Sequence, residues 1–227
     1  MKLIKKILQF IKAPFYFLKI NLYKFKSVED LVDFTQNRSG GFIRQMQISS
    51  EITSLLNRLE NEDIKNILEI GTARGGTLFS FSKVSSGESK LISIDLPKGD
   101  FGDGYSFLKI PLFKSFASKD KKIYLIRKDS HKGITLDEVK EILSDQKLDF
   151  LFIDGDHTYD GVKKDFEMYS SLVKEGGLIA FHDIVDGPKE NVGGVPRFWQ
   201  EVKNEHKYEE FIEDPLQGGY GIGLIKI

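Results

Sequence analysis

Short apolar runs alternate with longer amphipathic segments from about residue 46 to the end of the chain. Five runs are nearly continuous in hydrophobic residues, as in NILEI and LDFLFI, and they lie at residues 66–70, 91–95, 122–126, 148–153 and 178–181. Strands of a parallel sheet have this pattern because helices cover both of their faces. The segments before and between the runs predict helices at 46–59, 76–84, 105–117, 136–144 and 159–173.

The end of the chain breaks this alternation. A helix is predicted at 196–205, followed by a strand at 208–212, a turn at 215–219 and a final alternating run, GYGIGLIKI. Two strands joined by so short a connection are antiparallel, because a parallel crossover needs a dozen or more residues. The pattern therefore predicts an α/β fold: a Rossmann-like, doubly wound, mostly parallel seven-stranded sheet with a C-terminal antiparallel hairpin.

The net charge of −1 hides an uneven distribution of charge along the chain. Residues 1–26 contain seven lysines and no acid, so they carry +7 and the remainder carries −8. Leu3, Ile7 and Ile11 recur at helical spacing between the lysines, which is typical of an amphipathic helix at a membrane surface. A helix packed on the body of the protein or on a sister subunit has the same pattern. We expect a basic amphipathic extension at 1–45 and one domain at 46–227.

Lysines and Pro14 interrupt this extension, so no apolar stretch approaches the ~20 residues that span a bilayer. It also lacks the small-residue cleavage site of a secretory signal. We therefore expect a cytoplasmic protein. Peripheral contact of residues 1–26 with the inner face of the membrane is the alternative to packing of this segment on protein, which is the commoner fate of an apolar helix face.

The amino-acid composition limits the kinds of site that the protein can contain. With 40% hydrophobic and 30% charged residues, the chain has the balance of a globular protein and is not disordered throughout. The absence of cysteine excludes disulfides, thiolate metal sites and a cysteine nucleophile. Any metal ion must therefore bind carboxylate or imidazole groups. Lysine runs such as residues 163–164 are typical of solvated faces, so no nucleic-acid partner is expected.

The first two predicted strands end in residues suited to binding a nucleoside. LEIGTARGGT places Glu69 at the end of the first strand and glycines in the turn after it, where the backbone can approach a ligand closely. A dinucleotide fingerprint would have glycine at position 73, which is alanine, so NAD is disfavoured. Asp95 ends the second strand, where a carboxylate can accept hydrogen bonds from ribose hydroxyls.

These motifs resemble those of class I S-adenosylmethionine-dependent methyltransferases. The longer stretch FIDGDHTYDGVKKDFEMYSSLVKEGGLIAFHDI resembles a group that includes macrolide-sugar O-methyltransferases and cephalosporin-hydroxylase-like proteins. The resemblance extends from about residue 46 to the C-terminus. It implies S-adenosylmethionine as cofactor, bound by Glu69, Gly71, Thr72, Arg74, Gly75, Asp95, Asp129, Ser130 and Asp154.

Acids and histidines follow the fourth and fifth predicted strands. Asp154 and His157 follow the fourth strand, and His182 and Asp183 follow the fifth. Carboxylate and imidazole groups converging from neighbouring strand ends can bind a divalent ion. The resemblance implies a metal site at Asp154, His182 and Asp183. Metal-dependent O-methyltransferases usually have an acid or amide where this chain has His182. The imidazole therefore favours Mn²⁺ as an alternative to Mg²⁺.

The same resemblance implies that His157 is the general base. An imidazole that titrates near neutrality can take a proton from the acceptor hydroxyl. For any single histidine, a hydrogen-bonded structural role near the start of a helix is the simpler alternative. We favour function because the histidines and acids occur together at two strand ends.

Four further residues are predicted to contact the acceptor substrate: Asp156, Tyr159, Arg197 and Trp199. Arg197 and Trp199 lie in NVGGVPRFW, which we expect to close over the acceptor, although Trp199 is equally consistent with a core position. The sequence thus predicts an O-methyltransferase for a sugar or another hydroxylated small molecule, and the resemblance also suggests a homo-oligomer. A hydroxylase-like or other enzyme on the same fold, and a membrane-associated non-catalytic module, remain the alternatives.

Overall fold

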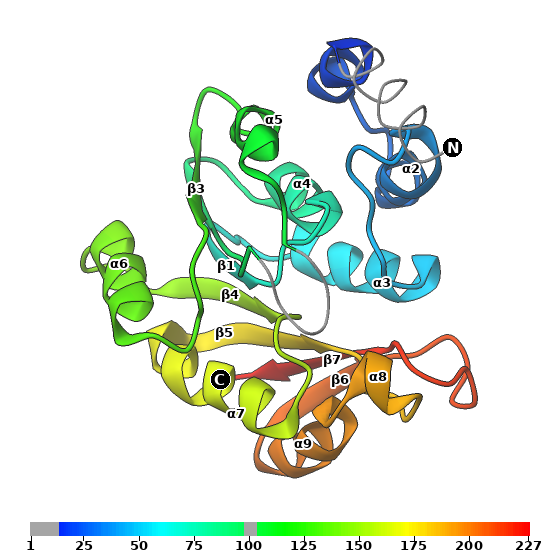
Figure 1. The fold of residues 1–227 in the computed structure, drawn as a ribbon, viewed down its shortest axis with the longest axis vertical. Helices are drawn as coiled ribbons and strands as arrows, with labels where there is room; N and C mark the ends of the chain where they lie inside the picture. The colour runs from blue at the N-terminus through cyan, green and yellow to red at the C-terminus, as the bar shows by residue number, and fades with distance from the viewer. Residues whose placement is uncertain (1–13, 98–103) are drawn as a thin grey trace.

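The computed structural model describes residues 14–97 and 104–227. Within these residues, seven strands form one sheet in the order β3-β2-β1-β4-β5-β7-β6 (Figure 1). Strands β1 to β5 are parallel, whereas β7 is antiparallel to both β5 and β6. The predicted sheet and its antiparallel C-terminal pair are therefore confirmed. The strands are β1 Asn66–Ile70, β2 Ser89–Ile94, β3 Lys121–Ile126, β4 Leu148–Ile153, β5 Val173–His182, β6 Lys207–Phe211 and β7 Ile222–Lys226.

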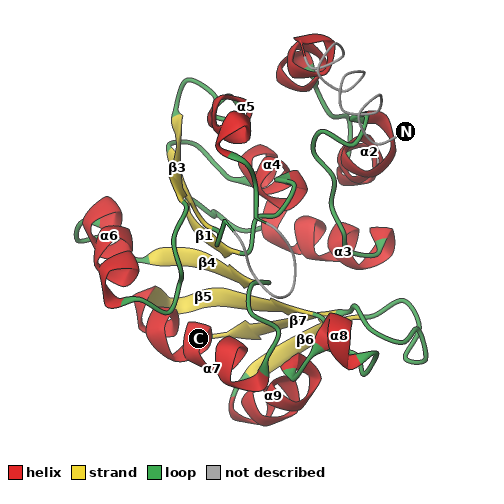
Figure 2. Cartoon of the chain, viewed as in Figure 1, coloured by secondary structure: helices red, strands yellow, loops and turns green. Residues whose placement is uncertain are grey.

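Helices cover both faces of this sheet (Figure 2). On one face, α2 Val28–Asp33, α3 Ser49–Glu60, α4 Gly76–Val84 and α5 Ile110–Lys114 contribute to a core rich in phenylalanine. On the other face, α6 Gly133–Leu143, α7 Tyr159–Tyr169 and α9 Val195–Val202 bury a second core. The short helix α8 Lys189–Val192 precedes α9. Two buried layers on one sheet explain why the strand sequences are apolar on both faces.

Single-turn helices occupy several connections. A π-helical turn, η1 Phe34–Arg38, follows α2, and 3₁₀ turns η2 Phe107–Lys109, η3 Ser170–Leu172 and η4 Lys203–Glu205 adjoin α5, α7 and α9. The helix expected at 105–117 is therefore shorter than predicted. Pro111 lies in the first turn of α5, where its missing N–H costs nothing, whereas within a longer helix it would break a hydrogen bond.

The described part of the expected N-terminal extension packs onto the sheet domain. Residues 14–22 are helical, and Ile20, Leu31, Phe34 and Ile43 belong to the same core as α3 and α4. The core thus continues across residue 45, the expected boundary. Residues 1–13 of the basic segment lie outside the described residues. No helix in the described ranges is long and apolar enough to cross a membrane.

Candidate active site

A pocket of about 590 Å³ opens where the parallel strands end. Its wall contains residues that follow β1, β2, β3 and β4, the end of β5, and the segments at 190–192 and 218–220. Ligands of open α/β sheets bind at this edge because loops leave the strands there in opposite directions. The polar strand ends identified in the sequence therefore meet in one pocket.

The turn after β1 forms one end of this pocket. Gly71 has φ +90°, and a Cβ there would lie 1.9 Å from the carbonyl oxygen of Asp154, so the turn requires glycine. Oδ2 of Asp95 accepts hydrogen bonds from the backbone N–H groups of Thr72, at 3.0 Å, and Ala73, at 2.6 Å. Burial raises the pKa of Asp95 to about 6, although these hydrogen bonds oppose the shift. Asp95, which lines the pocket, thus holds the turn after β1 in place through these two hydrogen bonds.

Several predicted cofactor residues lie beside or behind this wall. Glu69 is fully buried and accepts a hydrogen bond from the Thr72 hydroxyl at 2.7 Å. Burial raises the pKa of Glu69 to about 8. Arg74 is exposed, and Gly75 faces the ring of Phe113. The predicted residues that do line the pocket at this end are Gly71, Asp95, Asp129 and Ser130.

The turn after β3 is held from behind by α7. Tyr169 donates from its hydroxyl to the carbonyl oxygen of Ser130 at 2.7 Å. Nε2 of His131, which lines the pocket, lies 3.2 Å from Oδ1 of the buried Asp165. This interaction raises the pKa of His131 above its usual value, and burial raises that of Asp165. Sequence reasoning missed His131, although it directly follows the predicted Asp129 and Ser130.

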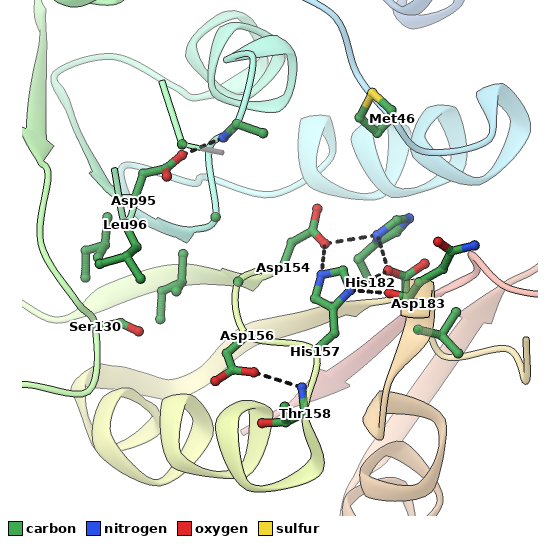
Figure 3. A pocket seen from close by; sticks show the side chains of 18 of the residues that line it. Met46, Asp95, Leu96, Ser130, Asp154, Asp156, His157, Thr158, His182 and Asp183 are labelled. Carbon is green, nitrogen blue, oxygen red and sulfur yellow. Dashed lines mark hydrogen bonds and ion pairs between the residues drawn. The ribbon is translucent and has the colours of Figure 1, made fainter. Parts of the chain in front are cut away.

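Two acids and two histidines form a cluster at the other end of the pocket (Figure 3). Nδ1 of His182 lies 3.0 Å from Oδ1 of Asp154 and 3.4 Å from Oδ2 of Asp183. His157 lies 3.5 Å from Asp154 through Nε2 and 3.3 Å from Asp183 through Nδ1. The structure therefore brings together the predicted metal and base residues.

The charges within this cluster stabilise one another. Burial would raise the pKa of Asp154, but the neighbouring charges of His182 and His157 hold it well below its ordinary value. Burial would lower the pKa values of both histidines, yet the acids raise the pKa of His182 well above its usual value. The acids, together with the Asn191 carbonyl oxygen 2.5 Å from Nδ1, raise the pKa of His157 to about 9. In the free protein the acids therefore favour the protonated form of both imidazoles.

Ligand atoms of Asp154, His182 and Asp183 all lie within 4.8 Å of one another, which is close enough for one cation. Nε2 of His182 is buried and has no hydrogen-bond partner among the described residues. Asp183 has φ +63°, a left-handed conformation that costs about 1–3 kcal/mol in a residue with a side chain, and strained residues cluster at functional sites. This donor set fits a divalent cation.

Comparison with known proteins identifies the family. Residues 68–184, just over half of the chain, match the model of a methyltransferase domain. The chain belongs to this methyltransferase family. The class I methyltransferase predicted from the sequence is therefore confirmed.

Curated relatives of this methyltransferase share part of their length with it. Tapetum-specific methyltransferase 1 of Arabidopsis thaliana is 31% identical over 119 residues, which are 52% of this chain and 46% of that protein. An uncharacterised protein of Acanthamoeba polyphaga mimivirus is 30% identical over 146 residues, 60% of this chain and 58% of that one. The chain thus spans about half the length of these relatives.

Solved structures show the same fold at lower identity. An O-methyltransferase from Bacillus cereus in complex with SAH has a TM-score of 0.61 and 17% identity, covering 91% of this chain and 92% of that one. A TDP-rhamnose 3'-O-methyltransferase of calicheamicin biosynthesis has a TM-score of 0.60 and 15% identity, covering 92% and 91%.

The structure places most of the predicted acceptor residues of this methyltransferase outside the pocket. Asp156 does line it. Trp199, however, is 0% exposed in the core, where its indole N–H donates to Glu210 at 2.6 Å. The Arg197 guanidinium lies over the Tyr159 ring, 4.3 Å from its centroid, away from the pocket wall. Helix α9 begins at Val195, so Arg197 and Trp199 belong to a helix that covers the sheet. Of the segment expected to close over the acceptor, Asn191 and Val192 line the pocket.

Proposed function

We propose that this protein is an S-adenosylmethionine-dependent O-methyltransferase acting on a hydroxyl of a sugar or another hydroxylated small molecule. One observation supports this proposal above all. The same pocket contains the glycine turn and Asp95 at one end and the cluster of Asp154, His157, His182 and Asp183 at the other. Methyl transfer requires a sulfonium donor and an acceptor oxygen in line, and a pocket with two chemically different ends accommodates both.

The cofactor is assigned to the end formed by β1, β2 and β3. Gly71 permits close approach of the ligand, Asp95 presents a carboxylate to ribose hydroxyls, and Asp129 with Ser130 borders the base. The Bacillus cereus neighbour, solved with SAH, supports this cofactor by its similar fold.

The acceptor is assigned to the end with the acid and histidine cluster. Asp154, His182 and Asp183 would hold Mg²⁺ or Mn²⁺, because carboxylate oxygens suit both ions and an imidazole favours the transition metal. When bound, such an ion supplies positive charge that lowers the pKa of an acceptor hydroxyl. The residues of the chain hold the ion and orient the acceptor.

His157 is proposed to receive the acceptor proton. Because neighbouring acids raise its pKa to about 9, the free protein favours the protonated imidazole, and a protonated imidazole cannot act as a base. Positive charge bound between Asp154 and Asp183 would oppose this shift and favour the neutral ring. The base role therefore depends on occupation of the cation site.

Calorimetry with SAH, with and without Mg²⁺ or Mn²⁺, tests both ends of the pocket. We expect Asp95→Ala to abolish SAH binding, and Asp154→Asn to abolish metal binding while leaving SAH binding in place. Asp137→Asn, in an exposed acid of α6, is the matched control. The absence of SAH and S-adenosylmethionine binding to the wild type would refute the proposed function. Oxygen consumption without a methylated product would instead support the hydroxylase-like alternative.

Contact with an anionic membrane is a second proposal, favoured by the helical segment at 14–22. Phe15, Leu18 and Leu22 recur at helical spacing and are exposed, and residues 1–26 carry +7. Basic segments beside apolar side chains bind anionic lipid. We expect the full chain to co-sediment with phosphatidylserine vesicles, and the triple variant Phe15→Ser, Leu18→Ser, Leu22→Ser to remain in solution. Equal sedimentation of both proteins would refute this role of the segment.

A further inference from the structure

The turn before β7 carries one bulky side chain among glycines. Tyr220 has φ +60°, and Gly218, Gly219 and Gly221 around it also have positive φ values. Glycine adopts this conformation without strain, whereas a residue with a Cβ does so at a cost in energy. A strained residue retained at a pocket suggests that its side chain has a function there.

Two acids hold this strained turn in place. Oδ1 of Asp183 accepts a hydrogen bond from the Tyr220 N–H at 3.2 Å. The buried Glu51 of α3 accepts hydrogen bonds from the Gly221 N–H at 3.0 Å and from the side chain of Gln217 at 2.7 Å. The two acids thus hold the backbone of the turn without any contact from the tyrosine ring. The backbone in turn determines where the ring lies.

The ring of Tyr220 lies at the acceptor end of the pocket. It lines the pocket wall and is 43% exposed. Its centroid lies 6.1 Å from that of His182, with the planes inclined at 59°. An exposed aromatic face therefore borders the cluster to which we assign the acceptor hydroxyl.

We propose that Tyr220 binds the acceptor by stacking against a ring of that molecule, so that the acceptor is a ring compound carrying the hydroxyl that faces Asp154 and Asp183. Aromatic rings pack against flat apolar faces and keep a polar edge for hydrogen bonding. Glu190 also lines the pocket, next to Asn191, whose carbonyl oxygen contacts His157 of the cluster, and this added negative charge favours a neutral ring over an anionic one. This assignment rests on the proposed function and deepens it.

The test measures binding of small neutral ring compounds to the protein loaded with SAH and Mn²⁺. Methyl α-L-rhamnopyranoside and catechol are the ring probes, and 1,2-propanediol offers neighbouring hydroxyls without a ring. We expect Tyr220→Ala to weaken binding of a ring probe about tenfold, and Tyr220→Phe to change it by less than about threefold. Binding of 1,2-propanediol should be the same in all variants.

Tyr220→Gly separates binding from folding. Glycine relieves the strain at φ +60°, so the melting temperature should stay at or above that of the wild type while binding of the ring probe weakens as it does in Tyr220→Ala. Tyr208→Ala is the matched control, since Tyr208 is 48% exposed and lies outside this pocket.

Three results would overturn the assignment. Unchanged binding of the ring probe by Tyr220→Ala would exclude stacking, and loss of SAH binding by that variant would indicate a structural role. Failure of the wild type to bind either ring probe would exclude a ring acceptor. If the wild type binds SAH but neither ring probe, the ring acceptor is excluded while the proposed methyltransferase function still holds. Failure of the ring assignment can therefore be distinguished from failure of the proposed function.

Discussion

Nε2 of Gln47 donates a hydrogen bond to Oδ2 of Asp154 at 2.9 Å, although the two residues are 107 positions apart in the chain. Gln47 lies just before α3, and Asp154 directly follows β4. The segment that enters the domain thus reaches the cluster of acids and histidines. Oδ1 of the same carboxylate faces His182, so Gln47 fixes how Asp154 presents its oxygens.

Replacement of Gln47 should weaken the site more than the fold. In Gln47→Leu, Asp154 loses a donor that orients it, and partners of this kind change metal affinity or activity by about 10- to 100-fold. Stability should fall by only about 1 kcal/mol. Methyl transfer, Mn²⁺ affinity and SAH affinity are the measurements, and SAH affinity should not change. The control is Gln146→Leu at an exposed position, and equal rates in both variants would contradict the prediction.

Glu69 should make stability depend on pH. Burial raises its pKa from 4.5 to about 8, so the folded protein binds a proton that the unfolded chain releases between these values. Stability therefore falls as pH rises through this window, by up to about 1.4 kcal/mol per pH unit. Glu69→Gln should remove this loss, and Glu88→Gln, at an exposed position, should keep it. Chemical unfolding across the pH range measures the difference, and parallel curves for Glu69→Gln and wild type would exclude this coupling.

The pair of His131 and Asp165 should make cofactor binding sensitive to alkaline pH. Asp165 raises the pKa of His131, so the positive charge of His131 is fully present below the ordinary histidine pKa, and its pairing with Asp165 is lost as pH rises through the raised value. Asp129 and Asp156 also face this histidine and act in the same direction. SAH affinity in the wild type should weaken at high pH as the turn loosens.

In His131→Asn, SAH affinity should be lower at neutral pH and flat across the same pH range. His206→Asn, at a residue outside the pocket, should keep the wild-type profile. Calorimetry at a series of pH values measures both. A wild-type profile in His131→Asn would assign the pH dependence to another group.

Trp199 should contribute to stability and not to substrate binding. Trp199→Phe removes the hydrogen bond to Glu210 and leaves a small cavity beside β7, which should cost about 1–3 kcal/mol. The kcat and KM of the folded fraction should match those of the wild type. A raised KM at unchanged stability would instead restore the acceptor role predicted from the sequence.

Hydrophobic periodicity was sufficient to predict the sheet, because both faces of every central strand are buried and strand sequences show this directly. The bounds of α4 were predicted to the residue. The site was predictable to the extent that its residues directly follow strands, as Asp95, Asp154 and Asp183 do. A parallel sheet brings such residues to one edge whatever the details of packing.

Residues that reach the site through tertiary contacts could not be predicted in this way. Gln47, Glu51 and Tyr220 lie in connections or on a helix, and no local pattern relates them to β4 or β5. Conversely, Arg197 and Trp199 have chemistry suited to substrate binding, yet the amphipathic pattern of α9 buries the tryptophan and turns the arginine outward. Side-chain chemistry alone could not distinguish a helix on the sheet from a loop over the pocket.

The order of the last two strands affects how the pocket assembles. β6 precedes β7 along the chain, yet β7 lies between β5 and β6 in the sheet, so β6 is joined to the rest of the sheet only through β7. Tyr220 lies two residues before β7, so its position depends on the pairing of β7 with β5. The pairing of β1, β2 and β3, which positions Gly71 and Asp95, requires neither strand. Loss of the β5–β7 pairing should therefore lower affinity for an acceptor more than affinity for SAH.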